Sequence, residues 1–206
     1  MAPGSSPERA KDAERLLARH GGTLLRIALA SIEHGLAHAR PLSVDPADYM
    51  PTLRAERASF VTLTLDGKLR GCVGKAMACR PLVNDVAENA YAAAFEDDRF
   101  DALTQADADG VDVEISVLSD PVPISFSGEA DLLDKLRPGV DGVILECNAR
   151  RGLFLPDVWE TVPDAREFLA HLKVKAGLAA DHWSNDIAAY RFTTVSTSLS
   201  GRGAAV

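Results

Sequence analysis

Apolar and polar residues alternate along residues 61–65 and again along 111–118, the pattern of strands with one buried face. Asp66-Gly67 marks a turn after the first of these segments, and a second alternating run extends from Leu69 to Val73. Residues 60–75 therefore predict a β-hairpin, and we expect the rest of the chain to be organised around it.

The polarity of the facing residues indicates the register of this hairpin. A two-residue loop would place Leu63 opposite Arg70 and mix apolar and charged side chains on one face. A three-residue loop, with Gly67 left-handed in a bulge, pairs Leu63 with Leu69 instead. We expect the three-residue loop, which leaves Arg70 and Cys72 together on the polar face.

Helical periodicity and capping residues predict the flanking elements. Expected are a short helix over 14–19 that stops at Gly21-Gly22, a longer helix from Thr23, helices after Pro81 and over 130–136, a helix capped by Asp164, a hairpin over 143–155 and a last strand over 190–195. Mixed helices and hairpins indicate an α+β fold, with a mainly antiparallel sheet built on the central hairpin and flanked by helices.

Composition narrows the class of protein. The 206 residues are 47% apolar and 25% charged, which is ordinary for a globular chain, and the net charge of −8 argues against a nucleic-acid partner. No run is long and apolar enough to span a membrane, and the first residues lack the apolar stretch of a signal peptide. Three cysteines without paired spacing indicate reduced thiols, so we expect a cytoplasmic protein. One of them, Cys147, lies in phase with Val143 and Leu145, so we expect it in the core.

Cys72 is the main candidate for chemistry, with Arg70 beside it. A thiol reacts as its thiolate, which a neighbouring cation favours, and Gly71 and Gly74 allow another chain or a ligand to approach the backbone closely. Together with Lys75 these residues form the predicted site. The alternative is that the glycines serve backbone geometry and Cys72 is a small packed residue.

Two further residue patterns are weaker. Asn89 falls on the small apolar face of the helix after Pro81, so it is a candidate for the same site or an amide bonded to nearby backbone. His34 and His38 have the i, i+4 spacing of metal ligands but lack a third ligand nearby, so we expect solvated histidines, no metal and no cofactor.

The segment Leu69-Arg70-Gly71-Cys72-Val73-Gly74 resembles the Leu-Arg-Gly-Cys-Ile-Gly signature of the AMMECR1 family. Further segments resembling the family are 94–100, 113–118, 142–146 and 154–156. The resemblance implies a domain with a larger and a smaller lobe, which we expect over 13–197. The composition of the two ends predicts a disordered tail over 1–12 and a flexible tail over 198–206. Asp101 and Ala102 stand where the family usually has prolines, which indicates a different shape for that loop.

Two functions are most consistent with these residues, and a metal site formed by Cys72 and a distant histidine is a weaker third. The first is a protein that modifies a small molecule with a reactive Cys72, while Arg70 binds a carboxylate or phosphate of the substrate. The second is a non-catalytic interaction module. The resemblance to the bacterial and archaeal branch, the AmmeMemoRadiSam system protein A, implies a Memo-like protein and a radical SAM protein as partners. It supplies no reaction, so enzyme activity stays open.

Overall fold

The structure is a computed structural model that describes residues 6–201, with side chains from residue 11 onward. Its contacts divide the chain into two compact units. The larger, which we call the hairpin unit, comprises 11–118 and 195–206, and the smaller, the second unit, comprises 119–194 with the first ten residues. Two four-stranded antiparallel sheets and flanking helices confirm the predicted α+β class.

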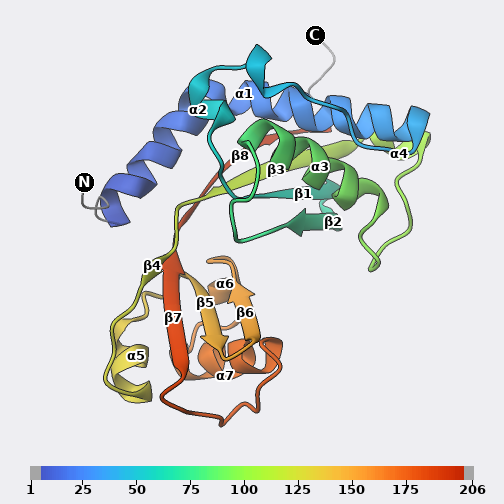
Figure 1. The fold of residues 1–206 in the computed structure, drawn as a ribbon. Helices are drawn as coiled ribbons and strands as arrows, with labels where there is room; N and C mark the ends of the chain where they lie inside the picture. The colour runs from blue at the N-terminus through green and yellow to red at the C-terminus, as the bar shows by residue number, and fades with distance from the viewer. Residues whose placement is uncertain (1–5, 202–206) are drawn as a thin grey trace. The chain divides into compact units, whose positions relative to one another are not determined.

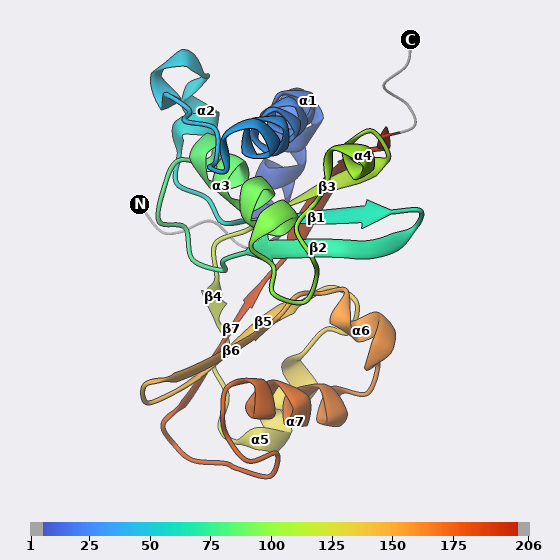
Figure 2. The same ribbon diagram turned by 90° about the vertical axis from the view of Figure 1, so that its right-hand side faces the viewer.

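The sheet of the hairpin unit has the strand order β2-β1-β3-β8. Its strands are β1 (Ser59–Leu65), β2 (Lys68–Gly74), β3 (Val111–Leu118) and β8 (Thr194–Leu199). The buried sides of β1 and β3 contribute Val61, Leu63 and Ile115 to a core shared with α1 (Ser6–His38) and α3 (Leu82–Phe95). Helix α3 crosses over β1 and β2 on this side of the sheet (Figure 2).

The first helix corrects a prediction. Instead of stopping at Gly21-Gly22, α1 runs without a break from Ser6 to His38 (Figure 1). A Cβ on Gly21 would lie 3.0 Å from Oγ1 of Thr197, so the helix crosses β8 closely at this point. Each glycine costs a helix about 1 kcal/mol. The apolar stripe that α1 buries on both sides of the pair outweighs that cost.

The loop of the central hairpin also differs from the prediction. Leu65 pairs with Lys68, so the loop has two residues, Asp66 and Gly67, and both have positive φ (51° and 74°). Such a turn matches the twist of the flanking strands. The predicted placement of Leu69 on the core face is wrong, because its side chain is 45% exposed.

A β-bulge explains how a two-residue loop still gives an apolar face. The register shifts after Leu63, and Arg70 is the additional residue on β2. Leu63 therefore pairs with Gly71, and Thr62 pairs with Cys72. Neither register considered from the sequence included this bulge, yet Cys72 keeps the side of the sheet that was predicted for it, away from the core.

The second unit has a smaller sheet of order β4-β7-β5-β6. Its elements are β4 (Val122–Pro123), α5 (Glu129–Lys135), β5 (Gly142–Cys147), β6 (Arg150–Phe154), α6 (Val158–Thr161), α7 (Ala165–Lys175) and β7 (Ile187–Phe192). Asp164 caps α7 as predicted, accepting hydrogen bonds from the N–H groups of Arg166 and Glu167, each at 2.9 Å. The buried faces of α7 and β5 form the core of this unit.

The remaining elements are short. The connections of the hairpin unit contain a 3₁₀ turn (Pro46–Asp48), α2 (Pro51–Arg54) and α4 (Gln105–Ala108). The single last strand predicted over 190–195 is two strands, β7 and β8, which belong to different sheets. Helix α1 begins within the segment expected to be a tail, and the predictions for 1–5 and 202–206 fall outside the described residues. Over 6–201, no helix combines the length and apolarity of a membrane span.

Candidate functional site

The backbone of Cys72 is held on both sides by an ion pair. The N–H of Cys72 donates to Oδ2 of Asp97 at 2.9 Å, and Nη2 of Arg99 donates to the carbonyl of Cys72 at 3.2 Å. Arg99 also forms a two-pronged pair with Asp97, through Nε at 2.9 Å and Nη2 at 2.7 Å. This Asp97–Arg99 clamp fixes the edge strand at the residue that carries the thiol.

The clamp is electrostatically strong. The hydrogen bond from Arg99 holds the pKa of the Asp97 carboxyl well below its usual range, against the opposing effect of burial, and the N–H of Cys72 adds to the lowering. The pKa of Arg99 is raised in turn, chiefly by its hydrogen bond to Asp97. The guanidinium of Arg99 therefore lies at the backbone of the residue that carries the thiol.

The sulfur of Cys72 lies on the polar side of the sheet and is half-buried. Oγ1 of Thr62 donates to Sγ at 3.2 Å. Thr62 is also paired with Glu114 on β3, so a thiol, a hydroxyl and a carboxylate follow one another across three strands. Directly paired residues project from the same face of a sheet. This side of the hairpin unit therefore presents groups that can donate, accept and attack.

A hollow of about 410 Å³ adjoins the clamp. Its lining contains two cations from different elements, Arg70 from the bulge of β2 and Arg99 from the loop after α3, together with Asp98, Phe100 and Asp101. Cys72 is not part of the lining, although its carbonyl is bonded to Arg99. The structure thus places Arg70 in the same hollow as Arg99, which in turn bonds the backbone of Cys72.

The two glycines of the motif are positions of close packing. A Cβ on Gly71 would lie 1.9 Å from the carbonyl oxygen of Ala93, so α3 rests directly on β2 at this residue. A Cβ on Gly74 would lie 2.3 Å from the carbonyl oxygen of Ser59. Lys75, which follows β2, is exposed. Gly71 therefore allows α3 to approach the strand, and Lys75 is accessible to a ligand.

Asn89 lies in a different, buried network. Its Nδ2 donates to Ser59 (backbone O at 3.0 Å and Oγ at 3.1 Å) and to Oδ2 of Asp85 at 3.0 Å. Burial raises the pKa of the Asp85 carboxyl, and hydrogen bonds from Ser59 and the charge of Arg80 oppose the rise. The amide of Asn89 joins α3 to the start of β1, and its recorded hydrogen bonds do not reach Cys72.

Comparison with known proteins identifies the family. The family model described as AMMECR1 matches residues 25–197, which is most of the chain. The chain belongs to the AMMECR1 family. The similarity first indicated by the Leu69–Gly74 motif thus extends through both units.

Related AMMECR1 proteins come from archaea and bacteria. A protein of Methanothermobacter thermautotrophicus is 40% identical over 174 residues, covering 84% of this chain and 90% of the relative. A Thermotoga maritima protein is 34% identical, covering 81% and 91%. The crystal structure of the uncharacterized protein PH0010 from Pyrococcus horikoshii matches with a TM-score of 0.78 at 34% identity, covering 88% of this chain and 92% of that one.

The other two thiols of this AMMECR1 chain differ in environment. Cys79 is exposed in the loop after β2. Cys147 is 3% exposed, as predicted for a core residue, and its Sγ lies 3.8 Å from Nε2 of His182 and 3.7 Å from Oγ of Ser184. Within residues 6–201, no group of three His, Cys, Asp or Glu side chains is arranged to hold a metal ion.

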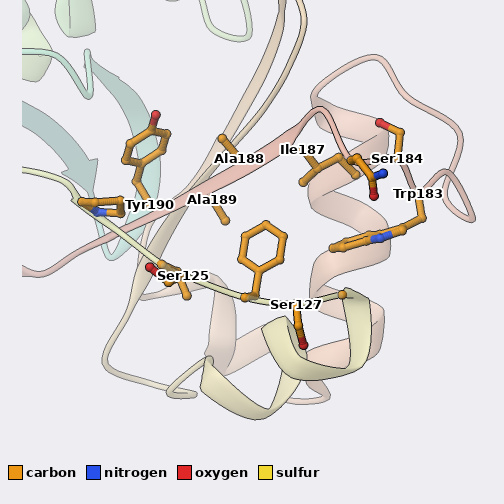
Figure 3. Close-up of a pocket in the computed structure, with 13 residues that line it drawn as sticks. Ser125, Ser127, Trp183, Ser184, Ile187, Ala188, Ala189 and Tyr190 are labelled. Atoms are coloured by element: carbon orange, nitrogen blue, oxygen red, sulfur yellow. The ribbon is translucent and has the colours of Figure 1, made fainter.

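The second unit of the AMMECR1 fold contains its own hollow, of about 430 Å³ (Figure 3). The rings of Phe126 and Trp183 line it with their centroids 5.8 Å apart. The N–H of Ile124 donates to the carbonyl of Ala189 at 2.8 Å, and beyond this bond the chain continues toward α5. The first residues of β7, 187–190, also line the hollow. We call this the β7 slot.

Sequence reasoning missed the residues that organise the thiol. Asp97 was noted only as part of the segment after α3, and Thr62 and Glu114 only as residues of alternating strands. Asp97 lies 25 positions from Cys72, and no local pattern reports that contact. The sequence signal that could have pointed to Asp97 was its position in the segment 94–100, which resembles the family and also contains Arg99.

Proposed function

We propose that this AMMECR1 protein modifies an anionic small molecule on the polar side of its hairpin unit, with Cys72 as the nucleophile. The Asp97–Arg99 clamp is the observation that carries the proposal, because it fixes the peptide of a half-buried thiol beside a hollow that contains two guanidinium groups. Arg70 and Arg99 bind the anionic group of the substrate.

The chemistry follows from the thiol. The proton of the Cys72 thiol is lost to solvent water, the sulfur forms a bond to an electrophilic carbon of the substrate, and the leaving group departs with the electron pair of the broken bond. A negatively charged group on the substrate directs it to the side of the sheet where Arg70 and Arg99 lie.

Two alkylating reagents of similar size test this proposal. Iodoacetate carries a negative charge and iodoacetamide does not, so the ratio of their rates at one cysteine reports the local field. We expect Cys72 to react faster than a free cysteine at neutral pH, and to show a rate ratio about fivefold higher than exposed Cys79, since about 1 kcal/mol of attraction changes a rate by that factor. Mass spectrometry of each peptide gives both rates.

Arg70→Gln should lower the rate ratio at Cys72 and leave Cys79 unchanged. Lys68→Gln is the matched control, because Lys68 is an exposed cation of the same strand that does not line the hollow. The proposal fails if Cys72 reacts no faster than free cysteine, or if the two reagents show the same ratio at Cys72 and Cys79.

A second function, an interaction module without catalysis, is favoured by the β7 slot. An extended segment of a partner can lie beside the beginning of β7 and pack an apolar side chain against the rings of Phe126 and Trp183. The partners to test are a Memo-like protein and a radical SAM protein. Co-purification at native expression levels should recover one of them, Trp183→Ala should reduce recovery, and Cys72→Ala should not. Recovery of neither protein contradicts this function.

A further inference from the structure

A second hollow of the hairpin unit is lined by residues of the first half of α1 and of the segment that contains α2, and its lining does not include Cys72. Figure 1 shows that these two segments lie side by side. The hollow has a volume of about 710 Å³. Arg15, Arg19 and His20 line it from α1, and Arg57 lines it from the connection between α2 and β1. We call the hollow lined by these four side chains the basic hollow.

The concentration of positive charge here is unusual for this chain. The protein has a net charge of −8, yet among the side chains described from residue 11 onward the lining contains three guanidinium groups and one carboxylate, that of Asp12. Asp12 forms an exposed ion pair with Arg15 at 3.7 Å, a kind of contact that neutralises little. Arg15 and Arg19 are also four residues apart on one helix, where like charges repel. Folding has therefore gathered cations whose mutual repulsion a bound anion would relieve.

Arg57 provides an independent indication of a ligand. Its Nε is buried and has no hydrogen-bond partner among the described residues. Buried donors are nearly always satisfied, and an unsatisfied one costs free energy, so each exception needs an explanation. Arg57 also lines the hollow, so an acceptor that arrives with a ligand would satisfy this Nε–H.

We propose that the basic hollow binds a phosphorylated small molecule. Guanidinium groups approach from two segments of the chain, an arrangement that suits a phosphate, with its several oxygens and double charge, better than one planar carboxylate. Buried Leu16 contributes an apolar part of the lining for the remainder of the ligand. The acidic net charge disfavours a nucleic acid as the occupant. This site is separate from Cys72 and does not depend on the function proposed above.

Inorganic pyrophosphate is the probe for this site. Isothermal titration calorimetry of the full chain at low salt should show saturable binding of pyrophosphate with one site per chain. Arg19→Gln and Arg57→Gln should each weaken binding about tenfold, since one charge-assisted hydrogen bond contributes about 1.5 kcal/mol or more. Arg19 is exposed, so its variant should fold even if the variant at Arg57 does not.

Arg26→Gln is the matched control, because Arg26 lies on α1 outside the lining and bonds only Thr23 within its own helix. It should leave pyrophosphate binding within twofold of the original chain, as should Cys72→Ala. The proposal is overturned if the original chain shows no saturable binding at pyrophosphate concentrations up to 1 mM. A dissociation constant of that size corresponds to a binding free energy of about −4 kcal/mol. Equal weakening by Arg26→Gln and Arg19→Gln, or binding of duplex DNA in preference to pyrophosphate, would also overturn the proposal.

Discussion

The two hairpins of this protein share a plan but expose their thiols differently. In β1–β2, Gly71 lies beneath α3 opposite Leu63, and in β5–β6, Gly152 lies beneath α7 opposite Leu145. Each glycine allows a helix to rest on the hairpin. Cys72 directly follows its glycine and therefore projects to the side of the sheet away from the helix.

Cys147 has the opposite orientation. It is two residues from Leu145 on β5, so it projects toward α7 and is buried in the core of the second unit. The position of a thiol relative to the helix-covered face thus decides whether it belongs to the core or to a site. The β1–β2 hairpin adds two features that β5–β6 lacks among the described residues, the bulge at Arg70 and the Asp97–Arg99 clamp.

The largest effect should come from filling the space under the helices. Gly71→Ala should lower the free energy of unfolding by about 3 kcal/mol, because its Cβ would meet a backbone carbonyl that can move only with the whole of α3. Gly152→Ala should cost about 1–2 kcal/mol, since its nearest contacts are 2.8 and 2.9 Å away. Urea unfolding of both variants measures the difference.

Gly128→Ala is the control for these variants, because a Cβ at Gly128 meets no atom within 4 Å. Its unfolding free energy should change by less than about 0.5 kcal/mol. Equal stability of Gly71→Ala and Gly128→Ala would show that α3 does not constrain β2.

Removing the clamp should have the next largest effect. Asp97→Asn should cost about 2 kcal/mol at pH 7, because charge-assisted hydrogen bonds to Arg99 and Cys72 are weakened. The folded pKa of Asp97 is depressed, so its contribution is fully present above the unfolded value of 3.8 and is lost as pH falls below it. The stability difference between the original chain and the variant should therefore shrink from pH 6 to pH 3. A difference that is constant with pH would contradict the ionic clamp.

Replacing Cys72 and Cys147 in turn by alanine compares the two thiols directly. Cys147→Ala should lower the unfolding free energy by about 1 kcal/mol, since it leaves a small cavity in a packed core. Cys72→Ala should cost about 0.5 kcal/mol, because the half-buried sulfur loses mainly its hydrogen bond from Thr62. A larger loss at Cys72 than at Cys147, measured by urea unfolding, would mean that Cys72 is the structural thiol.

The smallest effect is expected at the bulge. Arg70→Ala should change the unfolding free energy by less than about 0.5 kcal/mol, because the bulged residue contributes little packing. The pairing of Thr62 with Cys72 should persist in the cross-strand NOEs of an NMR spectrum. Loss of those NOEs would mean that the side chain of Arg70 maintains the register.

Local rules predicted a substantial part of this structure. The alternation along β1 and β3, the cap of α7 by Asp164 and the burial of Cys147 depend on residues within a few positions of one another. Period-2 alternation and capping are properties of adjacent backbone groups, so the sequence states them directly. The same rules placed Cys72 on the polar side of its hairpin, although the predicted register was wrong.

Only the tertiary structure decided what those elements do together. It joined two predicted helices across Gly21-Gly22, because burying one continuous apolar stripe outweighs the cost of two glycines. It also connected Asp97 to Cys72, and Arg57 to Arg19, across separations that no sequence pattern spans. Contacts of this kind are set by packing between distant segments. The sequence therefore determined the hairpins and the side on which Cys72 lies, whereas packing determined its clamp and the basic hollow.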